Sequence, residues 1–255
     1  MKNEGFIDIH SHSLWGIDDG SQSFGETLDM CDCAEENETS VLFVTPHLIY
    51  WDQAEDLLDE RDEKVEYLCE ELDELNSSLI IKKGFEILCD DEIFDIKYFK
   101  PYTLNESRYI LIEFDFYKTS EEDVKSWCKY LQSFGLVPII AHPERYGFVI
   151  DDIGCLDRLS DSGVLFQINA GSPAGAFGEN EMNVSCKMLE AGYADFIGSD
   201  AHRINIRNTD MFSLFEEYPY TIVEDEINKI AKINPLCILA DKKFVPKRKK
   251  YMQEL

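Results

Sequence analysis

Short apolar segments recur along the chain, separated by longer polar segments. Seven of them are rich in β-branched and aromatic residues, which is typical of strands. These predicted strands are Phe6–Ile9, Val41–Thr45, Leu79–Ile87, Tyr109–Phe114, Val137–Ala141, Val164–Asn169 and Ala194–Gly198, with a weaker run at Cys237–Ala240. Several are almost wholly apolar, which indicates strands buried on both faces, as in parallel sheets.

Between the predicted strands, apolar residues recur at helical spacing. In Gln53–Asn76 they fall three and four residues apart and form one stripe, in which Arg61 is the only polar member. A second helix is predicted from Thr119 or Ser120, where acidic residues suit a helix N-terminus, through Phe134, before a glycine that suits its end. Further helices are predicted at Glu179–Glu190, Thr209–Glu217 and Val223–Ile233.

The alternation of strands and helices over the whole length predicts an α/β fold with a mainly parallel sheet and right-handed crossovers. No low-complexity linker or internal repeat interrupts it, so residues 1–255 are predicted to form a single domain. About seven strands fit a closed or nearly closed barrel better than an open sheet, and such barrels commonly occupy about 250 residues.

The net charge of the chain limits the classes of ligand that it can bind. The 255 residues include 51 acidic and 24 basic side chains, and a formal charge of −27 disfavours nucleic acid and anionic lipid as ligands. The exception is a basic tail, residues 242–255, which we expect to be solvated, to dock on the acidic body or to contact a membrane surface peripherally. Its basic residues are Lys242, Lys243, Lys247, Arg248, Lys249 and Lys250.

Two further features favour a cytoplasmic protein. The N-terminus shows no basic stretch followed by an apolar run, and no segment approaches the roughly 20 apolar residues needed to span a bilayer. The eight cysteines are scattered without paired CxxC spacing, so we expect them to be reduced and mostly buried.

All five histidines lie at or just after the end of a predicted strand. They are His10, His12, His47, His142 and His202. In barrels and open α/β sheets, active sites are built at this carboxyl edge of the strands. The His-x-His pair also points both imidazoles to one side, because alternate side chains of a strand share a face.

Acidic residues occupy the same predicted edge. Glu86, Glu113 and Asp200 end strands or follow them, and Asp18 and Asp19 come after the first histidine pair. Imidazoles and carboxylates together are the ligands of Zn, Mn and Fe(II) hydrolytic sites. Eight candidates exceed what one ion needs, so we expect two or three divalent ions: His10, His12, His47, Glu86, Glu113, His142, Asp200 and His202.

The motifs DIHSH, GIDDGS, TPH, GFE, IEF, AHPERY and GSDAH occur in this order between about residues 6 and 240. In order and spacing they resemble the PHP (polymerase and histidinol phosphatase) superfamily. More narrowly, the chain resembles the CpsB/CapC-type bacterial protein-tyrosine phosphatases linked to capsular and extracellular polysaccharide synthesis. GIDDGS, AHPERY and the GAFG segment at 175–178 favour this branch.

The resemblance implies a distorted (β/α)₇ TIM-like barrel of the PHP type and a trinuclear centre, with Mn or Fe expected and Zn as a further candidate. By position, the eight residues above match the ligands, Arg145 and Arg207 match phosphate-binding arginines, and Asp19 matches an acidic residue beside the centre. Two positions depart from the pattern. Leu48 stands where many relatives have a second histidine, and Asn208 follows Arg207 where many have a nearby proline.

The expected reaction is hydrolysis of phosphotyrosine in proteins. No CxxxxxR phosphate loop is present, so metal-bound hydroxide is expected to attack phosphorus while Arg145 and Arg207 bind its oxygens. Asp19 would position the nucleophile or protonate the leaving group. The resemblance points to a bacterial tyrosine kinase with a tyrosine-rich tail as the partner, and no sequence feature specifies an oligomer.

Four alternatives stay open at the level of sequence. The same ligands would serve a phosphatase of a small metabolite such as histidinol phosphate. A nuclease would need a basic stripe, which occurs only in the tail. A metal-binding regulatory domain without catalysis would be expected to lack part of the ligand set, and an amidohydrolase would be expected to carry a lysine at a strand end.

Overall fold

In a computed structural model, which describes residues 5–219, 222–249 and 251–252, parallel strands form two sheets. One sheet has the order β1-β2-β4, with β1 at Phe6–Asp8, β2 at Thr39–Val44 and β4 at Ile80–Lys83. The other has the order β3-β5-β6-β7-β8-β9. Its strands are β3 His47–Leu48, β5 Glu86–Leu88, β6 Tyr109–Glu113, β7 Val137–Ala141, β8 Leu165–Asn169 and β9 Phe196–Gly198.

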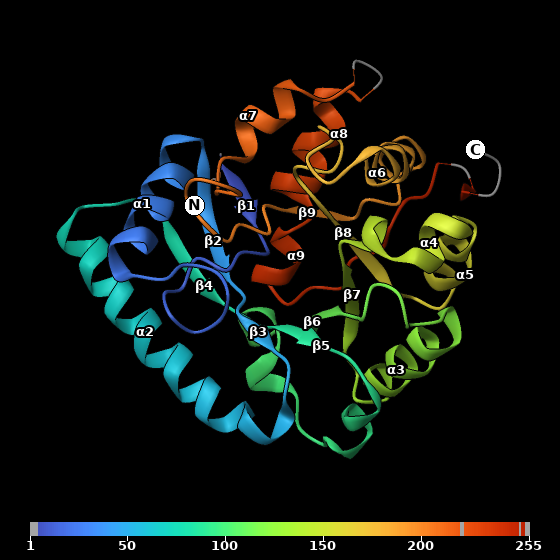
Figure 1. Cartoon of the computed structure of the whole chain (residues 1–255), viewed down its shortest axis with the longest axis horizontal. Helices are drawn as coiled ribbons and strands as arrows, with labels where there is room; N and C mark the ends of the chain where they lie inside the picture. The colour runs from blue at the N-terminus through green and yellow to red at the C-terminus, as the bar shows by residue number, and fades with distance from the viewer. Residues whose placement is uncertain (1–4, 220–221, 250, 253–255) are drawn as a thin grey trace.

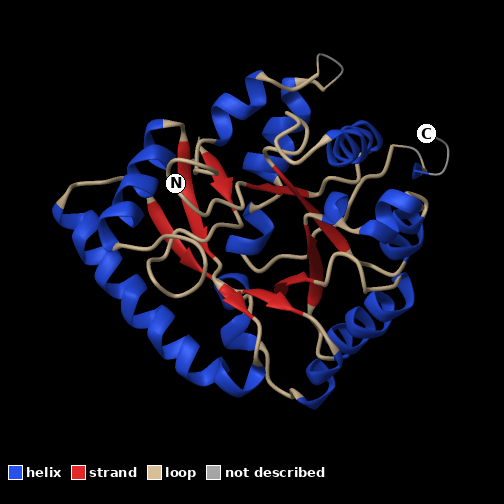
Figure 2. Ribbon diagram, in the orientation of Figure 1, coloured by secondary structure: helices blue, strands red, loops and turns tan. Residues whose placement is uncertain are grey.

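The two sheets are connected on both sides. The His12 N–H donates to the Ala201 carbonyl at 2.7 Å, which joins the segment after β1 to the segment after β9. On the other side, the chain itself joins the sheets, because only two residues separate β2 from β3 and two separate β4 from β5. The strands therefore curl around a common interior, with the longer helices outside them (Figure 1, Figure 2). A mainly parallel α/β fold, as predicted, is confirmed.

The helices follow the strands in alternation. They are α1 Phe24–Glu36, α2 Ala54–Glu74, α3 Glu121–Ser133, α4 Gly147–Asp151, α5 Cys155–Asp161, α6 Glu179–Ala191, α7 Met211–Glu216, α8 Glu224–Asn228 and α9 Leu236–Leu239, with a π-helical turn at Lys229–Ile233. Short 3₁₀ turns occur at Trp51–Gln53, Asp91–Asp95, Lys100–Tyr102, Leu104–Glu106 and Pro143–Arg145. Within the described ranges, no helix combines the length and apolarity that crossing a bilayer requires.

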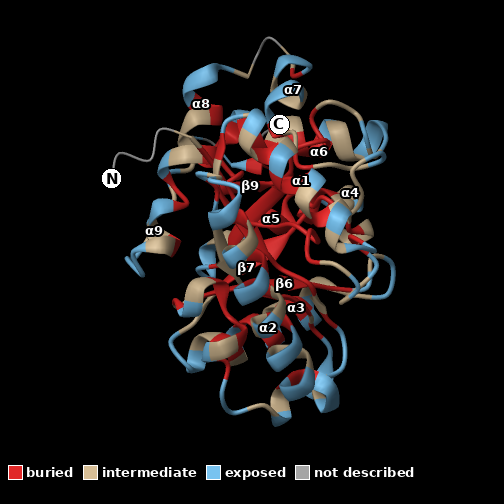
Figure 3. Cartoon of the chain, turned by 90° about the vertical axis from the view of Figure 1, so that its left-hand side faces the viewer, coloured by how far each residue is buried: buried red, intermediate tan, exposed pale blue. Residues whose placement is uncertain are grey.

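The core has two main layers, because the strands are buried on both faces. On β6, Tyr109 and Leu111 belong to the cluster inside the curled sheets, whereas Ile110 and Ile112 pack outward against the helices. Figure 3 shows the buried residues concentrated along the strands and the exposed ones on the outer helix surfaces. This two-sided burial is the physical reason for the nearly all-apolar strand sequences.

In two of the predicted helices, the structure shows which residues define the helix start or its packing. Ser120 caps α3 in a capping box with Asp123, which satisfies backbone N–H groups at the helix start. On α2, the polar member of the apolar stripe, Arg61, is buried. Its guanidinium lies 4.4 Å from the centre of the Phe85 ring and donates to the Gly84 carbonyl at 3.2 Å. Arg61 therefore links α2 to the sheet.

Some predicted elements differ from the structure. Leu79–Ile87 forms two strands, β4 and β5, which belong to different sheets. Cys237–Ala240 was predicted as a weak strand, and this is wrong. A helix, α9, begins after Pro235 there and places Ile238 in the interior cluster. A four-residue apolar run suits a buried helix turn as well as a strand. The helices α1, α4 and α5 and the strand β3 were not predicted.

The basic tail lies against the acidic body. Arg248 donates to both carboxylate oxygens of Asp195, at 2.8 and 3.0 Å, and to the Gly192 carbonyl at 2.8 Å. Lys249 pairs with Glu226 at 2.6 Å, and Met252 is buried. Of the alternatives for this segment, docking on the body is therefore the one observed. Lys250 lies outside the described residues. All eight cysteines are free, as predicted.

Candidate metal centre

The structure brings all eight predicted ligands together at the carboxyl edge of the strands. His10 and His12 follow β1, His47 follows β2, Glu86 follows β4, Glu113 ends β6, His142 follows β7, and Asp200 and His202 follow β9. Six of the eight are buried, and His47 and His202 are partly exposed. Parallel strands place their carboxyl ends at one edge, so residues distant in sequence converge there.

Four overlapping groups of these side chains could each hold a metal ion, because their ligand atoms lie within 4.8 Å of one another. The groups are His12-Asp19-His47-His202, His10-Glu86-His142, His10-His12-Asp200 and His47-Glu86-Glu113. They include all eight predicted ligands and Asp19. The sharing of ligands between groups suits adjacent ions bridged by common side chains.

Glu86 provides the clearest sign that cations fit here. Its Oε2 is fully buried and has no hydrogen bond, yet it lies 3.2 Å from His10 Nε2, 3.2 Å from His12 Nε2 and 3.1 Å from His47 Nδ1. A buried carboxylate oxygen without a partner is costly. A divalent cation among these four atoms would satisfy the oxygen and the imidazole lone pairs together.

Residues behind the ligands fix the orientation of the first two histidines. His10 Nδ1 lies 2.8 Å from Gln167 Oε1, and His12 Nδ1 lies 2.7 Å from Asp18 Oδ2. Both partners accept a hydrogen bond, so each imidazole carries its proton on Nδ1 and directs the Nε2 lone pair into the centre. Asp18 also accepts from the His47 N–H at 3.1 Å.

Sequence reasoning missed Gln167 and gave Asp18 no role. The signal for Gln167 was present, because it is the one amide inside an otherwise apolar stretch, VLFQI. Asp115, which follows β6, lies outside the centre and pairs with Lys118 at 3.2 Å.

The carboxylates also affect protonation within the cluster. Burial and the neighbouring His12 oppose a charged His47, but Glu86 and Glu113 raise the pKa of His47 to about 10. Burial alone would raise the pKa of Asp200, but His10, His12 and Arg207 hold it below its usual value. The centre thus attracts positive charge, and a cation would compete with protons for the same nitrogen atoms.

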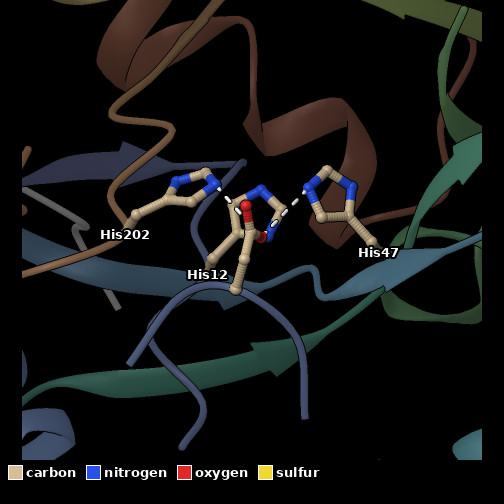
Figure 4. A group of neighbouring side chains, drawn as sticks. His12, His47 and His202 are labelled. Atoms are coloured by element: carbon tan, nitrogen blue, oxygen red, sulfur yellow. Dashed lines mark ion pairs between the residues drawn. The ribbon is translucent and has the colours of Figure 1, made fainter. Parts of the chain in front are cut away.

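Asp19 lies at the mouth of the centre. Its Oδ1 is 3.5 Å from Nε2 of both His47 and His202, and Figure 4 shows these two imidazoles on either side of His12. The Asp19 side chain is 71% exposed. A hydrogen bond with His202 lowers the pKa of Asp19 despite its partial burial. This favours an ionised carboxylate that binds or positions a group over one that donates a proton.

The two predicted arginines lie on the same cavity wall. Arg207 donates to Asp200 Oδ2 at 2.7 Å, and Arg145 donates to the same oxygen at 3.4 Å. The Arg145 guanidinium lies between two aromatic rings, 4.5 Å from the centre of Phe116 and 5.0 Å from that of Phe177. Phe177 also lies 5.5 Å from the Arg207 guanidinium. Both guanidinium groups thus contact an aromatic ring as well as Asp200.

The centre opens into a cavity of about 610 Å³. Its wall combines six of the candidate ligands and both arginines with apolar side chains, among them Ile17, Ile49, Leu57, Leu88 and Phe116. A charged end and an apolar wall suit a ligand that joins an anionic group to an apolar ring.

The family model described as "Capsular polysaccharide synthesis, CpsB/CapC" matches residues 6–240. The chain belongs to the CpsB/CapC family. Its sequence is 33% identical to a putative tyrosine-protein phosphatase CapC of Staphylococcus aureus over 240 residues, 91% of each chain. It is 30% identical to the tyrosine-protein phosphatase YwqE of Bacillus subtilis, over 86% of this chain and 89% of YwqE.

A solved structure agrees with this membership. The match comes from crystal structures of YwqE from B. subtilis and CpsB from Streptococcus pneumoniae, described as unique metal-dependent tyrosine phosphatases. The TM-score is 0.80 at 28% identity, with 94% of this chain and 97% of the other covered. In this CpsB/CapC chain, the two departures noted in the sequence leave the centre intact. Leu48 packs in the core, and Arg207 lies at the cavity although Asn208 follows it.

Proposed function

We propose that this chain is a metal-dependent phosphomonoesterase that hydrolyses phosphotyrosine in proteins. The observation that carries the proposal is the convergence of eight candidate metal ligands, six of which line one cavity together with two arginines, in a CpsB/CapC family member. The residues named as ligands are His10, His12, His47, Glu86, Glu113, His142, Asp200 and His202. We further propose that the curled sheets form a distorted (β/α)₇ barrel of the PHP type and that residues 1–255 are one domain.

The chemistry divides between the ions and the chain. Two or three divalent ions, Mn or Fe by the family resemblance, would neutralise phosphoryl oxygens and lower the pKa of water when bound. Arg145 and Arg207 bind the remaining phosphoryl oxygens with forked hydrogen bonds. Asp19, as a carboxylate at the mouth, orients the attacking water. A phenolate leaving group has a pKa near 10 and needs little protonation help.

The substrate follows from the relatives. YwqE is a tyrosine-protein phosphatase, CapC of S. aureus is described as a putative one, and the matched family concerns capsular polysaccharide synthesis. We propose that the physiological substrate is the phosphorylated tyrosine-rich tail of a bacterial tyrosine kinase of that process. Eight free cysteines suit a reducing cytoplasm as the place of action.

Metal removal tests the function. Protein stripped with chelator should lose phosphotyrosine-peptide turnover by at least about 100-fold and regain it with Mn²⁺, because the metal ions supply the main charge stabilisation. Elemental analysis before and after stripping measures the bound metal, and a phosphotyrosine-peptide assay measures the turnover. Full turnover without detectable metal would refute the mechanism. Faster turnover of histidinol phosphate than of every phosphotyrosine peptide would favour the small-metabolite alternative.

A further inference from the structure

A second cavity, of about 520 Å³, lies beside the metal centre. It is bounded by the segment after β8, the segment after β9 and α7. His202 and Arg207 line both this cavity and the one over the metal centre. A ligand whose phosphate contacts Arg207 therefore lies directly next to this second cavity.

The walls of the second cavity are largely apolar. Phe177, Ile206 and Leu214 line it, and the Ile206 side chain is exceptionally open to solvent for an isoleucine, at 87%. Phe177 lies in a tight loop between Gly175 and Gly178, whose φ angles of 84° and 124° favour glycine. An exposed apolar surface next to a reaction centre marks a binding surface more often than a solvated one.

The charged side chains of this cavity are already engaged within the protein. Arg203 donates to Glu26 at 2.8 Å, and Asp210 caps α7 by accepting from the Ser213 N–H at 2.9 Å. Because these groups have partners, the cavity discriminates through its apolar surface. It suits an aliphatic or aromatic side chain better than a charged one.

We propose that this cavity binds an apolar side chain next to the phosphotyrosine in the substrate polypeptide. The proposal rests on the proposed phosphatase function. With the phosphate on Arg145 and Arg207, the tyrosyl ring fills the metal cavity and the peptide backbone crosses its mouth. Residues of an extended chain rise about 3.3 Å each. A residue one or two positions away thus reaches the adjoining cavity beyond Arg207, and the enzyme selects sequence as well as phosphotyrosine.

The test uses the metal-loaded protein and matched phosphotyrosine peptides. Each peptide carries Leu or Gly at one position flanking the phosphotyrosine, and p-nitrophenyl phosphate serves as a substrate without flanking residues. We expect a preference for Leu of roughly tenfold in kcat/KM at one flanking position. Ile206→Ala and Leu214→Ala should each reduce that preference about threefold and leave p-nitrophenyl phosphate turnover unchanged.

Ile233→Ala is the matched control, because Ile233 is also exposed, at 62%, and lines neither cavity. It should keep the full preference. Equal turnover of Leu and Gly peptides at every position, or an unaltered preference in both cavity variants, would overturn the proposal while leaving the phosphatase function in place. Failure of the metal-loaded protein to hydrolyse any phosphotyrosine peptide would overturn both.

Discussion

Glu86 is the residue on which the candidate ions depend most directly. Its buried Oε2 lies 3.1 to 3.2 Å from three imidazole nitrogens and has no hydrogen bond, whereas its Oε1 lies 2.8 Å from His142 Nε2. Glu86 therefore contacts four of the five histidines. It belongs to two of the groups that could hold an ion, and its carboxylate would supply negative charge to both.

Glu86→Gln should reduce bound metal and lower phosphotyrosine-peptide turnover by at least about 100-fold, because the amide keeps the size of the side chain but loses its charge. Elemental analysis and kcat/KM measure the two effects. Asp115→Asn is the matched control, since Asp115 lies after a neighbouring strand but pairs with Lys118 outside the centre. Normal metal content in Glu86→Gln would contradict the assignment of this ligand.

Asp18 contacts the candidate ligands but does not belong to any of the groups that could hold an ion. It accepts from His12 Nδ1 at 2.7 Å and from the backbone N–H of His47 at 3.1 Å, so it orients two candidate ligands. Losing such a partner typically costs 10- to 100-fold in metal affinity. We expect Asp18→Asn to weaken Mn²⁺ binding by about that factor, measured by titration of the metal-free protein.

The Asp18→Asn variant should regain most of its turnover at high Mn²⁺ concentration, because the ligands themselves remain. This rescue separates an orienting role from a direct one. Unchanged Mn²⁺ affinity would show that Asp18 does not set the His12 tautomer. Turnover that stays low at saturating Mn²⁺ would place Asp18 in the chemical step.

At the scale of elements, the convergence of the eight candidate ligands could be predicted because strand ends carry them. The apolar runs locate the strands, and a parallel sheet gathers their carboxyl ends at one edge whatever the details of the helices. The bounds matter little for this: Leu79–Ile87 forms two strands, yet Glu86 still follows the carboxyl end of the first, β4, at the predicted edge.

Features that depend on loop conformation could not be predicted in this way. His142 and Asp200 themselves have positive φ angles, 35° and 51°. This backbone region is uncommon for residues other than glycine. The second cavity requires Phe177, Ile206 and Leu214 to meet from three separate segments. Periodicity carries no information about such contacts. The helix Leu236–Leu239 could not be predicted either, because it is too short to show a helical period.

At the scale of the molecule, the large negative charge is balanced locally at two opposite edges of the sheets. At the carboxyl edge, Glu86, Glu113 and Asp200 belong to the groups of side chains that could hold cations. At the amino edge, Asp195 directly precedes β9 and receives the tail residue Arg248. The Asp195 Oδ2 also accepts from the Phe166 N–H at 3.0 Å, so this carboxylate joins the tail, β8 and β9. The docked tail therefore stabilises the sheet behind the reaction centre.

The pair of Asp195 and Arg248 predicts a pH-dependent stability. Burial raises the pKa of Asp195 to about 6 although Arg248 opposes this, against an ordinary value of 3.8 in the unfolded chain. Between these values the folded state binds more protons than the unfolded state. The contribution of Asp195 to the free energy of unfolding is therefore largest below about pH 4 and falls as the pH rises to about 6.

Arg248→Ala removes the opposing cation, so the pKa of Asp195 rises further. The pH range over which ionisation of Asp195 lowers the free energy of unfolding then extends to higher pH. Leaving a buried charge without its partner costs about 3–5 kcal/mol. We expect a loss of that order in the free energy of unfolding at pH 7.5 and a clearly smaller loss at pH 5, where protonation relieves the buried charge. Urea denaturation at both pH values measures the difference.

The matched control is Lys243→Ala, which removes an exposed cation of the same tail. It should change the free energy of unfolding little at either pH. Equal losses for Arg248→Ala at pH 5 and pH 7.5 would show that Asp195 is not the group this arginine neutralises.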